Sequence, residues 1–182
     1  MNPSPRTASL PLRIDPLRLD NPRHCEALIA LLDLYAAGPS GRGQPLSARA
    51  RERLPSLLRS QAHYRGWLAF AGHAPSDSVQ ALGVVNAFLG VSTFRAQPLL
   101  NIHDLCVHPD YQRRGVGTAL LEAVEGAARG EGCCKITLEV LEGNLSARGI
   151  YRRAGFDDYR LRPALGQAIF LEKILACDED PR

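Results

Sequence analysis

The stretch of the sequence best suited to chemistry is a run of basic and glycine residues, Gln112-Arg113-Arg114-Gly115-Val116-Gly117. It separates an apolar segment, residues 99–107, from residues 117–129, whose apolar side chains recur at helical spacing. The first amides of a helix have no partner inside the helix and carry a partial positive charge. Glycines let an anion approach those amides, and arginines add positive charge. The run therefore predicts a phosphate or pyrophosphate site, with a plain loop before a helix as the alternative.

The segment before this turn contains two side chains that can accept a proton, His103 and Asp104. Successive side chains of a regular strand point to opposite faces. Alternation therefore predicts that His103 shares a face with Leu105 and Val107, and that Asp104 shares the other face with Cys106.

A second polar segment follows one predicted strand later. Asn144 is a suitable N-cap for a short helix that ends at Gly155. Ala147 and Tyr151 are four residues apart, so they should share one face of that helix. By itself, Tyr151 could equally be an aromatic residue of the core.

Length and composition predict one globular domain. The chain has 182 residues, of which 45% are hydrophobic and 23% are charged. We expect the domain to span residues 12–175, with a disordered tail at 1–11 and a frayed tail at 176–182. The net charge of +3 comes from arginines spread along the chain, so nucleic-acid binding is not expected. An arginine-bearing helix at residues 48–61 is the only feature that favours it.

The sequence contains neither a membrane-length apolar run nor a signal-peptide pattern. We therefore expect a cytoplasmic protein without membrane contact. The five cysteines are odd in number and lack the spacing of metal ligands. Reduced thiols and no metal site are the expectation.

The periodicity predicts an order of elements that positions these residues. Asp20 should cap the first helix, which has Pro22 in its first turn, and Pro55 should bend or divide the second. A turn at residues 73–78 should join two strands of an antiparallel meander. The expected strands cover residues 12–19, 66–70, 79–89, 99–107, 135–141, 156–161 and 167–173. The expected helices are one that follows Asp20 and ends at residues 38–43, one at residues 48–61, one at residues 117–129, and a short one from the Asn144 cap through Ala154. The strands on either side of the third helix should be parallel neighbours with a right-handed crossover.

Two motifs in this order resemble the GNAT superfamily of acetyl-CoA-dependent N-acetyltransferases. Residues 107–117, Val-His-Pro-Asp-Tyr-Gln-Arg-Arg-Gly-Val-Gly, match its V-x-P-x-x-Q/R-x-x-G-x-G/A motif. Residues 144–156, Asn-Leu-Ser-Ala-Arg-Gly-Ile-Tyr-Arg-Arg-Ala-Gly-Phe, match its N-x-x-A-x-x-x-Y-x-x-x-G-F segment. The resemblance is strongest over residues 99–156. It implies an α/β fold with a mixed, twisted sheet of about six to seven strands, splayed between residues 99–107 and 135–141, and helices on both faces.

The resemblance also implies a site for acetyl-CoA, as co-substrate, in that splay. The pantetheine arm would pair with the strand edge, the pyrophosphate would lie on the glycine turn, and the short helix would contact the arm and the sulfur. The residues implied for the cofactor are Leu105, Cys106, Val107, Gln112, Arg113, Arg114, Gly115, Val116, Gly117, Thr118, Asn144, Ala147 and Tyr151.

The chemistry implied is acetyl transfer to a primary amine by direct attack in a ternary complex. Tyr151 would lie by the sulfur, and a strand amide near Leu105 would polarise the carbonyl. The amine must lose a proton, and His103 is the first candidate base because arylalkylamine acetyltransferases carry a histidine there. Asp104 is the second candidate, and either side chain could instead satisfy buried hydrogen bonds.

The acceptor is left open as a small amine, an amino acid or a peptide. It should lie in a groove walled by residues 32–43, residues 88–94 and the C-terminal strands. The alternative to catalysis is an acyl-CoA-binding or sensing module, which would need neither His103 nor Tyr151. The expected partners are acetyl-CoA and the amine, and a homodimer is left open.

Overall fold

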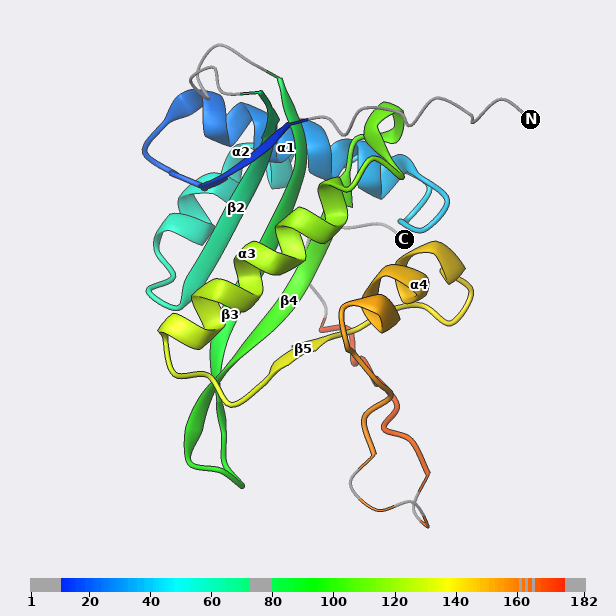
Figure 1. The fold of residues 1–182 in the computed structure, drawn as a ribbon. Coiled ribbons are helices and arrows are strands. Elements are labelled where there is room, and N and C mark those ends of the chain that lie inside the picture. Colours follow the sequence, from blue (N-terminus) through cyan, green and yellow to red (C-terminus); the bar gives the residue numbers. More distant parts are fainter. Residues whose placement is uncertain (1–10, 73–79, 161, 163, 165, 176–182) are drawn as a thin grey trace, which may run out of the picture.

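The computed structural model describes residues 11–72, 80–160, 162, 164 and 166–175, and its described strands form one mixed sheet in the order β1-β2-β3-β4-β5 (Figure 1). β1 to β4 are antiparallel neighbours, and β4 and β5 are parallel. The strands are β1 (Leu12–Pro16), β2 (Tyr64–Ala71), β3 (Ala81–Ser92), β4 (Gln97–Val107) and β5 (Ile136–Leu138), and the α-helices are α1 (Pro22–Ala37), α2 (Ala48–Arg59), α3 (Val116–Gly130) and α4 (Leu145–Arg153). The predicted α/β class, the antiparallel meander and the parallel β4–α3–β5 unit are confirmed.

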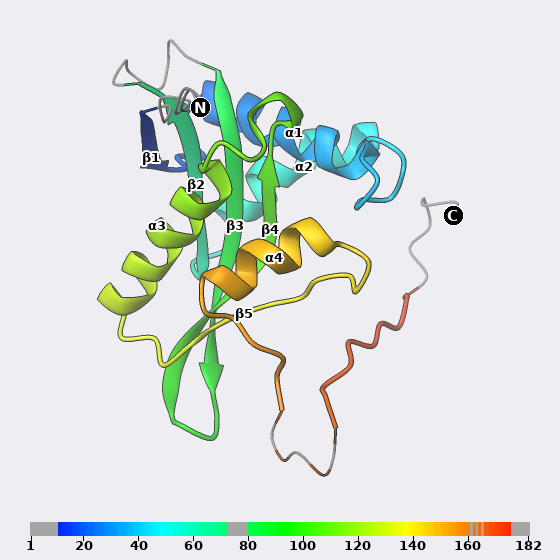
Figure 2. The same cartoon turned by 45° about the vertical axis from the view of Figure 1, so that its right-hand side comes forward.

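The helices cover both faces of the sheet, as the turned view in Figure 2 makes clear. One hydrophobic cluster joins α1 and α2 to the strands and includes Leu28, Leu31 and Leu58. The other joins α3 and α4 to the opposite face and includes Leu120 and Tyr151. We call these the α1/α2 face and the α3/α4 face. Apolar side chains at helical spacing form both layers.

Local capping explains where the helices begin. Asn21 caps α1, since its Oδ1 accepts from the Arg23 amide at 3.0 Å, and Pro22 fills the first helical position. The prediction that Asp20 caps this helix is therefore wrong by one residue. Pro55 lies within α2 without dividing it, because the carbonyl that loses its partner belongs to an exposed residue four positions earlier.

β5 is the shortest strand and it stays beside β4 only briefly. The paired positions are Leu100 with Ile136, Asn101 with Thr137, and Ile102 with Leu138. β4 continues for five more residues, to Val107, so the two strands separate beyond Ile102. The predicted splay is present, and it shortens the predicted strand at residues 135–141.

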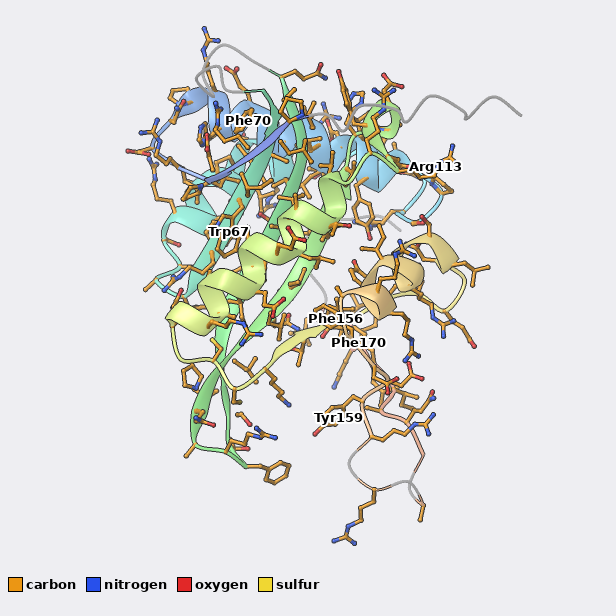
Figure 3. All side chains as sticks on the ribbon, in the orientation of Figure 1. Trp67, Phe70, Arg113, Phe156, Tyr159 and Phe170 are labelled. Atoms are coloured by element: carbon orange, nitrogen blue, oxygen red, sulfur yellow. The ribbon has the colours of Figure 1, made fainter. Side chains whose placement is uncertain are left out.

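The predicted strands at residues 156–161 and 167–173 are not formed among the residues that the structure describes. A single backbone bond, from the Ala168 amide to the Tyr159 carbonyl at 3.1 Å, links these segments. Ile169, Phe170 and Leu171 keep more than three quarters of their surface exposed. Figure 3 places Tyr159 and Phe170 on the chain that extends away from the sheet. These segments have the apolar alternation of strands, but their large apolar side chains at residues 169–171 stay exposed. The predicted turn at residues 73–78 and the predicted tail at 176–182 lie outside the described residues.

Candidate active site

A β-bulge in β4 shapes the centre of the site. Asn86 on β3 pairs with Asp104, but the next residue, Ala87, pairs with Ile102. His103 is therefore an extra residue with no partner of its own on β3. Because a bulge adds one residue to one strand, it shifts the alternation of side chains beyond it.

The bulge corrects the predicted faces of this strand. Leu100 and Ile102 are buried on the α3/α4 face, and Leu105 packs against the same cluster. Cys106 is buried on the α1/α2 face, and Asp104 contacts the polar residues of that face. The ring of His103 packs edge-on against Phe88 of the α1/α2 face, with centroids 4.9 Å apart.

His103 and Asp104 thus lie on one face, although alternation predicted opposite ones. The prediction that His103 shares a face with Leu105 and Val107 is wrong. Alternation no longer favours either residue over the other as the base.

Asp104 is held by a buried polar chain that crosses three strands. The Asn86 Nδ2 donates to Asp104 Oδ2 at 2.9 Å, and the Tyr64 hydroxyl donates to Asn86 Oδ1 at 2.8 Å. Asn86 is only 2% exposed. Burial, and secondarily the charge of Asp104, raises the pKa of Tyr64 well above its usual value. Tyr64 is therefore a neutral donor.

The hydroxyls of Tyr35 and Tyr151 also have raised pKa values. Burial raises the pKa of Tyr35, on α1, and nearby Cys106 and Asp104 add to the rise. Burial likewise raises the pKa of Tyr151, on α4, to about 12, with contributions from Tyr35 and Cys106. Both hydroxyls therefore stay protonated at ordinary pH.

The glycine turn forms the start of α3. Gly115 is the N-cap with φ of 87°, a left-handed conformation that favours glycine, and Arg113 has φ of 59°. No side chain caps this helix, so its first amides keep their capacity to bind an anion. The Arg114 guanidinium lies 5.4 Å from the centroid of the Tyr111 ring. The Gln112 side chain reaches toward the Val107 carbonyl at 3.5 Å.

Gly117 faces the gap between β4 and α4. A methyl group on Gly117 would lie 3.5 Å from Ile150 Cδ1, and 3.7 Å from both Leu105 Cδ2 and Val107 Cγ2. The predicted cofactor residues of β4 and α3 are therefore neighbours. Beyond Ile102, none of the described strands pairs with β4 on its β5 side, so its backbone edge is open to the described part of the chain.

The start of α4 completes this part of the site. Asn144 is the N-cap, and its Oδ1 accepts from the Ala147 amide at 3.2 Å, as predicted. Tyr151 is 9% exposed and packs against Phe156, with ring centroids 5.8 Å apart. The ring of Tyr151 belongs to the hydrophobic core, as the structural interpretation predicted. Burial also raises the pKa of its hydroxyl, so the hydroxyl can still act as a neutral donor.

A cavity of about 740 Å³ lies between the second half of α3 and the end of α4. Of the predicted cofactor residues it contains only Thr118, and it contains none of the side chains around Asp104. It is therefore separate from the catalytic candidates. Among the described residues, no group of three or more potential ligands could hold a metal ion, and the four described cysteines are free. No described helix is long and apolar enough to cross a bilayer.

Sequence reasoning missed Tyr35, Tyr64 and Asn86. The signal for Asn86 was a lone amide in the middle of an apolar strand, since such a group needs buried partners. Tyr35 follows Leu28, Leu31 and Leu32 at helical spacing, a pattern that indicates only a core-facing side of α1. Nothing in the sequence connected Tyr64 with the bulge.

The fold and site define a class: single-sheet α/β proteins whose sheet opens beside an uncapped, glycine-rich helix N-terminus. The sequence profile of the acetyltransferase (GNAT) family matches residues 30–156. The chain belongs to this family.

Individual relatives agree with that assignment. The chain is 36% identical over 61 residues to the [ribosomal protein bS18]-alanine N-acetyltransferase of Escherichia coli K12, a match that covers 34% of this chain and 41% of the relative. A relative of the same name from Shigella flexneri matches equally. The match thus spans less than half the length of these curated relatives.

Solved structures share the fold over nearly the whole chain. An aminoglycoside acetyltransferase from an uncultured soil metagenomic sample, in complex with sisomicin, has a TM-score of 0.70 at 19% identity and covers 91% of this chain and 97% of its own. AAC(6')-Iy in complex with a CoA bisubstrate analog has a TM-score of 0.66 at 18% identity, covering 90% and 99%. A Trypanosoma brucei acetyltransferase has a TM-score of 0.63 at 21% identity, covering 90% and 100%.

Proposed function

We propose that this protein is an N-acetyltransferase that moves an acetyl group from acetyl-CoA to a primary amine. The observation that carries the proposal is the uncapped, glycine-rich start of α3 beside the open edge of β4, the strand that carries Asp104. A carboxylate that can accept a proton and a hydroxyl that stays protonated are the two groups that acetyl transfer to an amine requires. Family membership supports acetyl-CoA as the donor.

The residues present suit a bound CoA. The uncapped start of α3, from Arg113 to Thr118, offers amides and guanidinium groups for the pyrophosphate. The open edge of β4, at Leu105 to Val107, offers backbone groups for the pantetheine amides. Gly117 leaves room beside that edge. Asn144 and Ala147 would line the arm from α4. Bound there, acetyl-CoA supplies the activated acetyl group.

The proposed reaction is a direct attack. The neutral amine nitrogen bonds to the thioester carbonyl carbon, and the carbon–sulfur bond breaks as the acetyl group leaves CoA. Asp104 takes the proton that the amine loses, and the Tyr151 hydroxyl, keeping its proton, donates a hydrogen bond to the departing thiolate. A backbone amide near Leu105 would polarise the carbonyl.

We assign the base to Asp104 and keep His103 as the competing candidate. Asp104 is held in place by the hydrogen bond from Asn86. His103 is exposed and packs against Phe88 instead. We expect Asp104→Asn to lose most of kcat/KM, by roughly a hundredfold or more, and His103→Ala to keep it within a few fold. Loss of kcat/KM in His103→Ala, with Asp104→Asn still active, would reverse the assignment.

The acceptor can be searched by class. The relatives are named for an alanine of ribosomal protein bS18 and for aminoglycosides, so the panel should contain alanine-bearing and other peptides, aminoglycosides, simple alkylamines and amino acids. We expect CoA thiol release that depends on one of these classes. CoA binding without transfer to any of them would instead favour an acyl-CoA-binding module.

A homodimer and a cytoplasmic location are further proposals. The exposed apolar side chains of residues 169–175 support self-association, because contiguous exposed apolar surface on soluble proteins usually has a partner. Light scattering across a concentration series tests this, with Phe170→Asp as the variant that should shift a dimer to monomer. A constant monomer mass would reject the dimer. Fractionation of cells expressing the protein tests the location.

A further inference from the structure

The polar chain behind Asp104 has a fixed direction. A carboxylate can only accept hydrogen bonds, so the side of Asn86 that faces Asp104 must be its NH₂ group, 2.9 Å from Oδ2. The Asn86 carbonyl oxygen then faces Tyr64, whose hydroxyl must donate at 2.8 Å. Burial raises the pKa of that hydroxyl, which keeps its proton in place. The charged state of Asp104 thus fixes the orientation of the Asn86 amide, and the Asn86 amide fixes the direction of the Tyr64 hydroxyl.

The backbone makes room for this chain at Gly66. Gly66 pairs with Asn86 across β2 and β3 and is buried. A methyl group at Gly66 would lie 2.2 Å from the Tyr64 hydroxyl oxygen and 2.8 Å from its Cζ, which is closer than atoms can approach. The tyrosine therefore reaches Asn86 only because the intervening residue has no side chain.

We propose that Tyr64, Gly66 and Asn86 form a positioning network that holds one oxygen of Asp104 and leaves the other oxygen free to take the proton of the acceptor amine. This inference rests on the proposed function of Asp104 as the base. Fixing Oδ2 stops the carboxylate from rotating away from the amine, and the Asn86 donor stabilises its charged form. Tyr64 acts on Asp104 only through Asn86, and Gly66 acts only through Tyr64.

The surroundings of Asp104 leave Asn86 as its main stabilising donor. Tyr35 approaches from α1, Tyr64 from β2, and His103 and Cys106 are its neighbours on β4. Among the described residues, no lysine or arginine forms an ion pair with Asp104. Loss of the Asn86 donor therefore removes stabilisation of the carboxylate that no neighbouring cation replaces.

The test is the pH dependence of kcat/KM in variants of the full chain. Asn86→Leu should lower kcat at least about tenfold and move the acidic limb of activity to higher pH, because the charged base has lost the hydrogen bond that Asn86 donates. Tyr64→Phe should give a smaller change in the same direction, and Gly66→Ala should resemble Tyr64→Phe. The double variant Asn86→Leu/Tyr64→Phe should be no worse than Asn86→Leu alone, because Tyr64 acts through Asn86.

Two measurements separate positioning from general destabilisation. CoA affinity should stay within about twofold in every variant, since the network does not touch the cofactor residues. Ser92→Ala removes another buried polar group of β3, far from the bulge, and should leave the pH profile unchanged. If Asn86→Leu does not fold, Tyr64→Phe and Gly66→Ala carry the test.

The outcomes distinguish the inference from the proposed function. Unchanged limbs in Tyr64→Phe and Asn86→Leu, with Asp104→Asn inactive, would overturn the network and leave Asp104 as the base. An active Asp104→Asn with the pH profile of the unaltered protein would overturn both. Additive effects of Tyr64→Phe and Asn86→Leu would also overturn the network, because two residues acting in series cannot add.

Discussion

Tyr151 combines a core ring with a hydroxyl that keeps its proton. It is 9% exposed, and burial raises its pKa to about 12. The hydroxyl can therefore donate to a thiolate throughout the pH range of an ordinary assay. Its benefit arises only as negative charge develops on sulfur, so it should appear in the rate and not in ground-state binding.

We accordingly expect Tyr151→Phe to lower kcat about a hundredfold while acetyl-CoA affinity changes by less than about threefold. The phenylalanine ring keeps the packing against Phe156. Single-turnover transfer and calorimetric CoA binding measure the two quantities. Equal transfer rates would make Tyr151 a structural residue only.

The same burial predicts how stability depends on alkaline pH. The folded-state pKa of Tyr151 and of Tyr64 is raised, so both stay neutral in the folded protein while the unfolded chain ionises near pH 10. Their contribution is complete below pH 10 and is lost as pH rises toward 12. The slope is at most about 1.4 kcal/mol per pH unit for each tyrosine. Urea unfolding should be measured between about pH 9 and 11, where tyrosine ionises. The free energy of unfolding should fall less steeply with pH in Tyr151→Phe than in the unaltered protein. Tyr159→Phe, at an exposed position, is the control and should keep the original slope.

At the scale of elements, the sequence predicts most of what local chemistry decides. Apolar periodicity located α1, α3 and α4, and the N-cap at Asn144 and the glycine turn before α3 were correct. The cap of α1 was misplaced because Asp20 and Asn21 are both good caps, and only the position of Pro22 separates them.

The elements that sequence could not predict depend on contacts between strands. The bulge at His103 depends on the register between β3 and β4, and the sequence of β4 contains no residue pattern that predicts it. The C-terminal segment has the alternation of a strand but no neighbour in the sheet, so its pattern alone could not decide its structure. The Asn86–Tyr64 contact spans two strands, which local periodicity cannot relate.

The start of α3 offers a test of anion binding. A Cβ at Gly117 would meet only ordinary contacts of 3.5 Å or more, but Gly117 is buried beside aliphatic side chains, so the Tm of Gly117→Asp without CoA is measured first. Its carboxylate would oppose the phosphates, so CoA affinity should fall at least about tenfold. Gly126→Asp adds the same charge to an exposed position of α3 with open space around it, and should bind CoA normally. Equal affinities in both variants would place the phosphates elsewhere.

At the scale of the whole molecule, the strands of the sheet differ in how many residues pair with a neighbouring strand. β2 and β3 are paired on both sides, whereas β5 meets β4 at three residue pairs and is followed in the chain by α4. A segment held by so few pairs should open locally more often than the rest of the sheet. A ligand bound between β4 and α4 would bridge the two parts.

We therefore expect CoA to protect β5 and α4 selectively. At a hundredfold excess over its dissociation constant, CoA should stabilise the protein by about 2.7 kcal/mol, a rise of roughly 5 to 10 °C in Tm. Hydrogen exchange should slow most in residues 136–153 and least in β2. Gly117→Asp should lose both effects at the same CoA concentration. Uniform protection across the sheet would argue against a ligand at the splay.

The bulge in β4 can also be considered as a one-residue insertion. Ile102 and Asp104 already pair with consecutive residues of β3, Ala87 and Asn86. Deleting His103 would therefore leave a regular strand in which every core side chain, from Leu100 to Val107, keeps its present face. A deletion inside a central strand usually turns half of the strand inside out, but here the shortened chain should still fold, with Tm within about 10 °C. Any loss of acetyl transfer in that folded variant would then measure how much the extra residue at position 103 contributes to the rate.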